Sequence, residues 1–321
     1  MTTSIGNLDN QPRAILSHTP TPIDEMPNLA RHIGTASLFA KRDDCTGLGM
    51  GGNKARQLEF YLGEAVRQNA DTVLITGAVQ SNFVRTAAAA ARKMDMDIHI
   101  QLEARVPNPS PLYYHSGNVL LDRIYGATLH SFPEGEDEVG ADNNLEAIAE
   151  DLRAKGRVPY VIHLGPGHPP RGALGYVVAA RELVEQMIET GLSFDEIVVP
   201  SGSGATHAGF LFGLRALGCT IPVKGICVRR TKDQQTPRIT KRCQEIADLL
   251  EMENPAAVVA NATDLPLIGS LEDIAGNSIA ATSDGDKPRL LAPVDLHAIK
   301  AAGVTFVKSM LERVIEEQAK G

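Results

Sequence analysis

The sequence predicts an α/β protein with parallel sheets, because short strand patterns alternate with longer helix patterns along most of its 321 residues. The strand patterns are apolar runs, often β-branched and followed by glycine: 72-TVLIT-76, 97-DIHIQL-102, 159-PYVIHL-164, 196-EIVVP-200 and 222-PVKGICV-228. Helix patterns lie between and around them, at about 82–93, 117–125, 142–155, 172–190 and 206–218. Strands in such βαβ units form parallel sheets that helices cover on both faces. A chain of this length usually divides into two domains.

A further helix is expected before the first of these strands. Its apolar residues recur at i, i+3, i+4, i+7 and i+8, which predicts one buried face: Leu58, Tyr61, Leu62, Ala65 and Val66. The acidic segment 132–144 predicts a loop. The amphipathic stretch at about 294–318 predicts a final helix, although Gly303 in its middle costs about 1 kcal/mol relative to alanine.

The composition excludes several classes of partner. The chain has 31 Lys and Arg against 39 Asp and Glu, a formal net charge of −8, and no basic run, so we expect no nucleic-acid partner. The opening MTTSIGNLDNQPR lacks the features of a signal peptide, and no stretch of about 18 apolar residues could cross a bilayer. We therefore expect a cytoplasmic protein without membrane association. The spacing of the four cysteines matches no zinc or redox pattern, so we expect no metal site: Cys45, Cys219, Cys227 and Cys243.

The strongest anion-binding signal is the segment 196-EIVVPSGSGATHAGF-210, where a buried strand ends in small residues that open a helix. Backbone N–H groups at such a turn, together with the helix dipole, hold a phosphate without a formal charge. The candidate phosphate residues are Ser201, Gly202, Ser203, Gly204, Ala205 and Thr206. The segment lacks the lysine of a Walker loop and the spacing of GxGxxG. A plain strand-to-helix turn of small residues is the alternative.

A second signal is a lysine at the start of the helix that follows a glycine-rich segment. In 49-GMGGNKARQLEF-60, Lys54 lies in the first helical turn, where the helix dipole favours anions. A positive helix end lowers the pKa of an amine, which suits a nucleophile that forms a Schiff base with a carbonyl cofactor. An exposed surface lysine is the alternative.

A third signal follows the strand at 72–76. In 76-TGAVQSNFVRTAAAAAR-92, Ser81 and Asn82 lead into an alanine-rich helix. Ser81 is a natural N-cap residue, and capping alone could explain it. Capping does not explain the whole polar triplet Gln-Ser-Asn.

These three segments, in this order, resemble the pyridoxal-phosphate enzymes of the tryptophan synthase β-subunit fold, specifically the family of D-cysteine desulfhydrase and 1-aminocyclopropane-1-carboxylate (ACC) deaminase. The resemblance covers about residues 15–255 and rests on KRDDCTGLGMGGNKARQLEF, TGAVQSN, SGNVLLDR, GALGYV and PSGSGATHAG. The segment 164-LGPGHPPRGALGYV-177 resembles the L-cysteate sulfo-lyases of the same group more than the deaminases.

The resemblance implies two three-layer domains with parallel sheets: residues 1–50 with 164–255 as a large cofactor-binding domain, and residues 51–163 as a small one. It implies that Lys54 holds the cofactor aldehyde, that Asn82 hydrogen-bonds the ring oxygen, and that Ser201 to Thr206 hold the phosphate. Ser81 would approach the substrate carboxylate or, in a deaminase, help to activate the ring-opening nucleophile. The resemblance also places Lys54 where it would move a proton.

The implied reaction is an α,β-elimination from a small amino acid, D-cysteine or L-cysteate, that yields pyruvate, ammonia and sulfide or sulfite. Deamination of ACC is the alternative. A homodimer is expected because closed dimers are the commonest soluble assembly.

The sequence departs from the family in two places. Phe83 stands where the family usually has His after Gln-Ser-Asn, and the family's C-terminal Leu-Asp-Pro-Val-Tyr-Thr segment has no counterpart after Pro255. Residues 256–321 are therefore predicted to be an atypical segment, and 290–321 resembles part of the fumarylacetoacetate-hydrolase family. If that segment replaces a wall of the site, a protein that binds the cofactor without turnover is a further alternative.

Three other polar residues could face the site. His168 and Arg171 are expected in a solvated loop, although an arginine facing the pocket would suit a sulfonate or carboxylate. His207 is expected to be a packed or capping residue rather than a catalyst.

Overall fold

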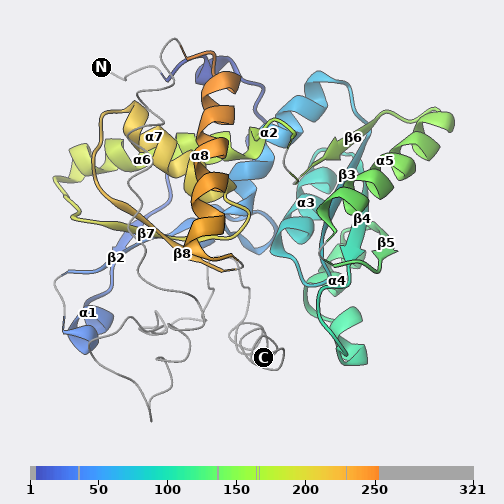
Figure 1. Ribbon diagram of the computed structural model, residues 1–321, viewed down its shortest axis with the longest axis horizontal. Coiled ribbons are helices and arrows are strands. Elements are labelled where there is room, and N and C mark those ends of the chain that lie inside the picture. Colours follow the sequence, from blue (N-terminus) through green and yellow to red (C-terminus); the bar gives the residue numbers. More distant parts are fainter. Residues whose placement is uncertain are drawn as a thin grey trace.

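The computed structural model describes residues 5–34, 37–135, 137–163, 165, 167–228 and 230–252 (Figure 1). Its strands are β1 (Ile23–Glu25), β2 (Phe39–Lys41), β3 (Thr72–Ala78), β4 (Asp97–Glu103), β5 (Thr128–Phe132), β6 (Pro159–Ile162), β7 (Ile197–Ser201) and β8 (Val223–Cys227). Its α-helices are α1 (Pro27–Ile33), α2 (Lys54–Arg67), α3 (Asn82–Lys93), α4 (Gly117–Ile124), α5 (Glu138–Ala154), α6 (Leu174–Thr190), α7 (Ala205–Ala216) and α8 (Lys232–Leu249).

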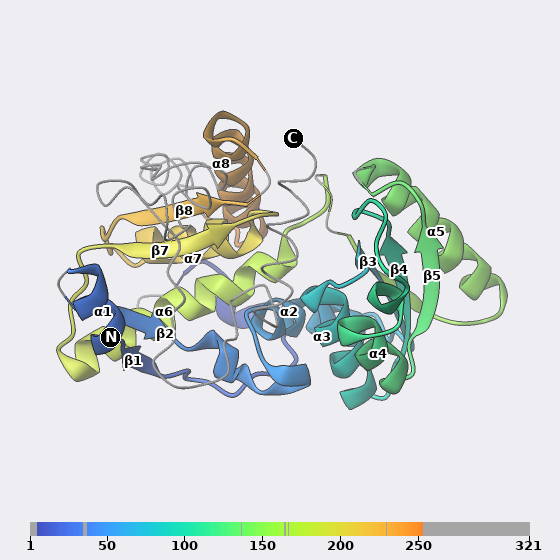
Figure 2. The same ribbon diagram turned by 90° about the horizontal axis from the view of Figure 1, so that it is seen from below.

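One part of the molecule is a four-stranded parallel sheet in the order β5-β4-β3-β6. Successive side chains of a strand point to opposite faces, and β3 shows this clearly. Val73 and Ile75 pack with α2 and α3, whereas Leu74 packs with Leu145 and Ala149 of α5. Helices therefore cover both faces of the sheet, with α3 and α4 on one side and α5 on the other (Figure 2).

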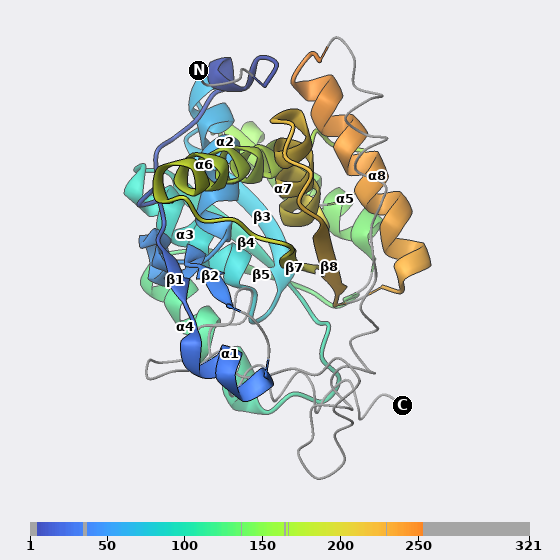
Figure 3. The same cartoon turned by 90° about the vertical axis from the view of Figure 1, so that its left-hand side faces the viewer.

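The other part contains the parallel pair β7-β8 and the antiparallel pair β1-β2 (Figure 3). Its core is formed mainly by α6, α7 and α8, with fully buried side chains such as Leu174, Phe212 and Ile246. Ile5 and Leu8, near the start of the chain, complete this core.

Helix α2 lies between these two parts in both views (Figures 1 and 2). Phe60 packs in the core around α6 and α7, whereas Leu58 and Leu62 pack in the core around β3 and β4. The helix is thus buried from both sides, and its first residue, Lys54, lies where the two parts meet. The division into residues 1–50 with 164–255 and residues 51–163 remains a prediction.

The predicted α/β class with parallel sheets is confirmed, and the five expected strands lie within a few residues of their predicted positions. Strands β1, β2 and β5 and helices α1 and α8 were not predicted. The antiparallel β1-β2 pair is the exception to parallel pairing among the described residues.

Two local predictions were wrong. Val66 is 49% exposed, so the buried face of α2 ends at Ala65. The expected acidic loop ends early, because the Asp137 side chain accepts a hydrogen bond from the Gly140 amide and so starts α5 at Glu138. The atypical segment 256–321 and its predicted helix lie outside the described residues. Each described helix is too short or too polar to span a membrane.

Candidate active site

The three segments singled out in the sequence meet around one cavity of about 250 Å³. Lys54 enters it from the start of α2, Ser81 and Asn82 from the start of α3, and Ser203 and Ala205 from the start of α7. The carboxyl ends of β3 and β4 form another wall. Ligands of α/β proteins bind at this end of the strands.

Lys54 begins its helix after a turn whose backbone conformation requires glycine. Gly51 and Gly52 have φ of 73° and 111°, and a Cβ atom on Gly51 would lie 2.0 Å from the carbonyl oxygen of Asp44. Only glycine fits there. The Lys54 amine lies 5.2 Å from the centre of the Phe83 ring, and burial lowers its pKa to about 8. The direction of this shift agrees with the prediction, and its cause is the loss of solvent around the amine.

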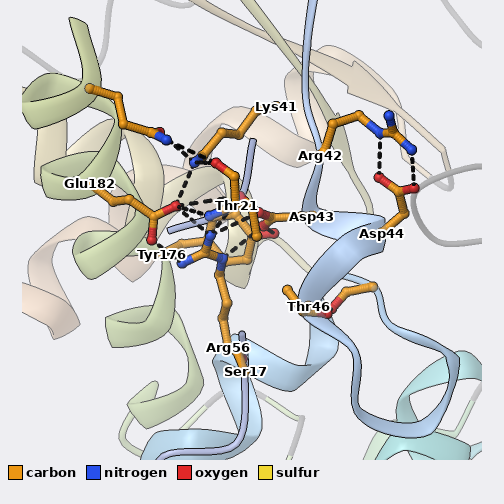
Figure 4. Close-up of polar contacts among 12 residues, drawn as sticks. Ser17, Thr21, Lys41, Arg42, Asp43, Asp44, Thr46, Arg56, Tyr176 and Glu182 are labelled. Atoms are coloured by element: carbon orange, nitrogen blue, oxygen red, sulfur yellow. Dashed lines mark hydrogen bonds and ion pairs between the residues drawn. The ribbon is translucent and has the colours of Figure 1, made fainter. Parts of the chain in front are cut away.

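A buried ionic network anchors α2 two residues after Lys54 (Figure 4). The Arg56 guanidinium, 1% exposed, forms paired hydrogen bonds with the carboxylates of Asp43 and Glu182, all 2.9–3.0 Å long. Lys41 donates to Glu182, and the Tyr176 hydroxyl donates to Asp43 over 2.6 Å. Two cations thus face two carboxylates, so the charges balance inside the protein. The network joins the loop before the glycine turn to α2 and α6.

Ser81 and Asn82 have different surroundings. The Ser81 hydroxyl accepts a hydrogen bond from the Phe83 amide over 3.2 Å, which makes it the N-cap of α3, as the capping interpretation expects. The Asn82 side-chain oxygen accepts one from the Asn118 amide group over 2.9 Å. Both residues line the cavity.

The segment after β7 has the geometry of an anion cradle. Gly204, with φ of 96°, is the N-cap of α7. Gln235 donates to the Gly202 carbonyl over 3.1 Å, and Arg238 donates to the Ser203 carbonyl over 2.9 Å. These carbonyls therefore point toward α8. The first N–H groups of a helix have no partner within that helix, so those at the start of α7 suit a phosphate.

The outer members of the segment do not line the cavity. Ser201 is 1% exposed, and its hydroxyl contacts His207 Nδ1 over 2.9 Å and accepts from Gln235 over 2.8 Å. The Thr206 hydroxyl accepts from Asn53 and Gln57 over 3.0 and 2.7 Å. Thr206 thus ties the start of α7 to the turn that carries Lys54.

Several charged residues of the cavity were missed. Glu103, the last residue of β4, pairs with Arg105 over 2.6 Å, and Thr76 donates to Glu103 over 2.7 Å. Glu138 of α5 pairs with Arg238 of α8 over 3.7 Å. Arg242, Asp142 and His163 also line the cavity. The signal for Glu103 was available, because it directly follows a predicted strand at the sheet edge where the site lies.

The three other polar candidates lie as follows. His168 stacks on His163 with ring centres 3.7 Å apart, and Arg171 lies 3.7 Å from the Glu64 carboxylate. Neither lines the cavity. His207 is 3% exposed and burial lowers its pKa to about 4, so it is a neutral packed residue, as expected.

Comparisons of sequence agree with this geometry. A family model described as "Pyridoxal-phosphate dependent enzyme" matches residues 15–280. ACC deaminase of Bradyrhizobium diazoefficiens is 36% identical over 316 residues, which cover 98% of this chain and 91% of that protein. D-cysteine desulfhydrase of Klebsiella pneumoniae is 37% identical over 256 residues, which cover 80% of this chain and 76% of that protein.

Solved structures are similar as well. A crystal structure titled as an ACC deaminase homologue has a TM-score of 0.68 and 40% identity, and the match covers 77% of this chain and 72% of that chain. Diaminopropionate ammonia lyase of Escherichia coli, in its apo form, has a TM-score of 0.53 at 19% identity. That match covers 69% of this chain and 62% of the other, and it supports the fold alone.

Proposed function

The chain belongs to the family of pyridoxal-phosphate-dependent enzymes, and we propose that it is a lyase for a small amino acid with a leaving group on Cβ. The proposed substrates are D-cysteine and L-cysteate. With one water, they would yield pyruvate, ammonia and sulfide or sulfite.

The observation that carries the proposal is the position of Lys54. Its amine lies in a cavity bounded by Asn82 on one side and by the start of α7 on the other. A pKa of about 8 leaves a useful fraction of the amine uncharged at neutral pH, as both Schiff-base chemistry and proton transfer require.

The surrounding residues fit pyridoxal phosphate. Bound there, the cofactor would stabilise the negative charge that develops on Cα when its proton leaves. Lys54 would hold the cofactor aldehyde and then move the Cα proton, and Asn82 would donate to the ring oxygen. Ser203 and Ala205, with the N–H groups at the start of α7, would hold the phosphate. Ser201, Gly202, Gly204 and Thr206 would shape this loop, through the contacts described above.

The substrate carboxylate would lie near Ser81. The Ser81 hydroxyl caps α3, so Ser81 lies beside the first N–H groups of this helix. Those N–H groups favour an anion. Phe83 removes the titratable group that a histidine would offer at this position. Proton transfer is therefore assigned to Lys54 alone among these residues.

ACC deamination, which would yield 2-oxobutanoate and ammonia, is the second candidate. The alignment with the Bradyrhizobium ACC deaminase favours it, because that alignment extends over 98% of the chain and so reaches into residues 256–321. The resemblance of residues 290–321 to a fumarylacetoacetate-hydrolase segment remains a prediction. So do the cytoplasmic location and the homodimer, which we include in the proposal.

The experiment is a parallel assay of the cofactor-loaded protein on D-cysteine, L-cysteate and ACC. Pyruvate with sulfide or sulfite would support the lyase, and 2-oxobutanoate would support the deaminase. An absorbance band near roughly 410–430 nm with neither product would support the alternative of a protein that binds cofactor without turnover. Lys93→Ala, on the exposed end of α3, is the control for variants of Lys54.

A further inference from the structure

We propose that Asn118 is a positioning residue that orients the Asn82 amide toward the cofactor, and that Arg85 and Gln80 in turn orient Asn118. The inference rests on the proposed function, since it concerns how this chain presents Asn82 to the cofactor's ring oxygen. None of the three orienting residues lines the cavity.

Asn118 is the second residue of α4 and is 4% exposed. Its side-chain nitrogen donates to the Asn82 Oδ1 over 2.9 Å and to the Gln80 carbonyl over 2.7 Å. Its backbone N–H donates to the Gln80 side-chain oxygen over 2.8 Å. The amide side chains of Gln80, Asn82 and Asn118 are thus hydrogen-bonded to one another or to the adjoining backbone where α4 meets the start of α3.

The oxygen and nitrogen of an asparagine side chain can exchange places by rotation of the amide group. Which orientation is adopted depends on whether the neighbouring groups donate or accept hydrogen bonds. Arg85 only donates hydrogen bonds, and its guanidinium lies 3.4 Å from the Asn118 Oδ1. The Gln80 carbonyl only accepts, and it lies at the other end of the same amide. Two independent neighbours thus fix Asn118 with its nitrogen toward Asn82.

Gln80 is fixed in the same way. Its side-chain nitrogen donates to the carbonyls of Tyr113 and Ser116 over 2.6 and 3.0 Å, so its oxygen faces the Asn118 backbone N–H. Arg85, 2% exposed, also donates to the Gly51 carbonyl over 3.3 Å. It therefore links the turn before Lys54 to the amide that orients Asn82.

The consequence is a choice of polarity at Asn82. With Oδ1 taken by Asn118, the group that Asn82 offers to a ligand oxygen is its N–H. The ring oxygen of pyridoxal phosphate carries negative charge and needs a donor. If the Asn82 amide were reversed, its Oδ1 would face the ring oxygen, and two hydrogen-bond acceptors would lie against each other. A hydrogen bond donated by Asn82 stabilises the deprotonated ring oxygen. It therefore lowers the pKa at which the bound cofactor loses its proton.

The test replaces Asn118 by aspartate in the full-length, cofactor-loaded protein. Asn118→Asp keeps the shape and the acceptor for Arg85 but cannot donate to Asn82. We expect the pH midpoint of the cofactor's absorbance change to rise by about one unit. This rise corresponds to a tenfold decrease in the acid dissociation constant of the bound cofactor. Because aspartate adds a charge beside Arg85 and one helical turn from Asp122, the same substitution is also made in an Asn82→Ala background.

In that background the effect should shrink to less than about 0.3 unit if it acts through Asn82. An equal rise in both backgrounds, or an unchanged midpoint in the single variant, would overturn the proposal. If the aspartate variant does not unfold cooperatively, Asn118→Ser replaces it, because its hydroxyl is uncharged and too short to reach Asn82. A wild-type protein without the cofactor band would instead contradict the proposed function.

Discussion

The buried network around Arg56 allows a quantitative prediction about Glu182→Gln. The glutamine has the same shape, but it removes one negative charge and places an N–H₂ group against donors. Glu182 accepts from Arg56, from Lys41 and from the Thr21 amide, so at least one donor loses its partner. The side chains of Arg56 and Glu182 are only 1% and 10% exposed, so water cannot compensate.

Removing one partner from a buried ion pair costs about 3–5 kcal/mol. We expect the lower end, about 3 kcal/mol, because Asp43 continues to pair with Arg56. The pKa of Glu182 leads to a similar figure. Burial raises this pKa, but hydrogen bonds and charges from Arg56 and Lys41 outweigh burial and lower it from 4.5 to about 2. At 1.36 kcal/mol per pH unit, this difference corresponds to about 3 kcal/mol.

The sign of the pH dependence follows. A carboxylate with a lowered pKa in the folded state stabilises the fold above about pH 4.5, and this contribution is lost as the pH falls toward 2. The wild-type free energy of unfolding should therefore fall over this range. In Glu182→Gln it should fall by about 3 kcal/mol less.

Urea unfolding at pH 7 and across the acid range measures both effects. Glu185→Gln, an exposed position on the same helix, is the matched control and should change stability by less than about 0.5 kcal/mol. If Glu182→Gln is as stable as this control, the network does not stabilise the fold in the way we describe.

Three further predictions concern the site. Borohydride reduction of the cofactor-loaded protein, followed by peptide mapping, should label Lys54, and Lys54→Ala should lose both label and turnover, whereas a label on another lysine would exclude the assignment. In the cofactor-free protein, the rate of reaction with pyridoxal phosphate should rise with pH to a midpoint of about 8, because burial lowers the Lys54 pKa, and a midpoint above 10 would contradict this. Gly204→Asp should abolish cofactor retention in gel filtration, because the new carboxylate would repel the phosphate. The control Gly218→Asp, at a position with a similar positive φ and open space around it, should retain the cofactor. Equal retention by both variants would exclude residues 201–206 as the phosphate site.

The fold was predictable where burial and periodicity coincide. Strand β3 is almost fully buried and β4 has a buried majority, and both were predicted from their apolar residues. Strand β5 escaped prediction because its residues are exposed or half-buried and, among the described strands, it pairs only with β4 at the edge of the sheet. Helix α8 escaped because polar residues dominate it, including Gln235 and Arg242, which are buried against the phosphate loop and the cavity.

The site was predictable where local chemistry determines it. Glycine turns and small residues before a helix indicate phosphate and amine positions without knowledge of the fold. Glu138, Arg238 and His163 reach the cavity from elements far apart in the chain, and no local pattern marks them. Their position depends on how α5, β6 and α8 pack, which periodicity does not determine.

Helix α2 shows why hydrophobic periodicity misplaces buried polar residues. Lys54, Gln57 and Tyr61 recur at i, i+3 and i+7 and line the cavity, whereas Arg56 and Phe60, at i and i+4, face the core around α6. Hydrophobic patterns assign polar residues to solvent, but here each buried polar residue has a partner from another element. The same short segment therefore holds the reactive amine and the ionic anchor. A substitution that disrupts the Arg56 network should therefore displace the Lys54 amine, which lies only two residues away in the same helix. Substitutions at the exposed end of α2 should not displace it.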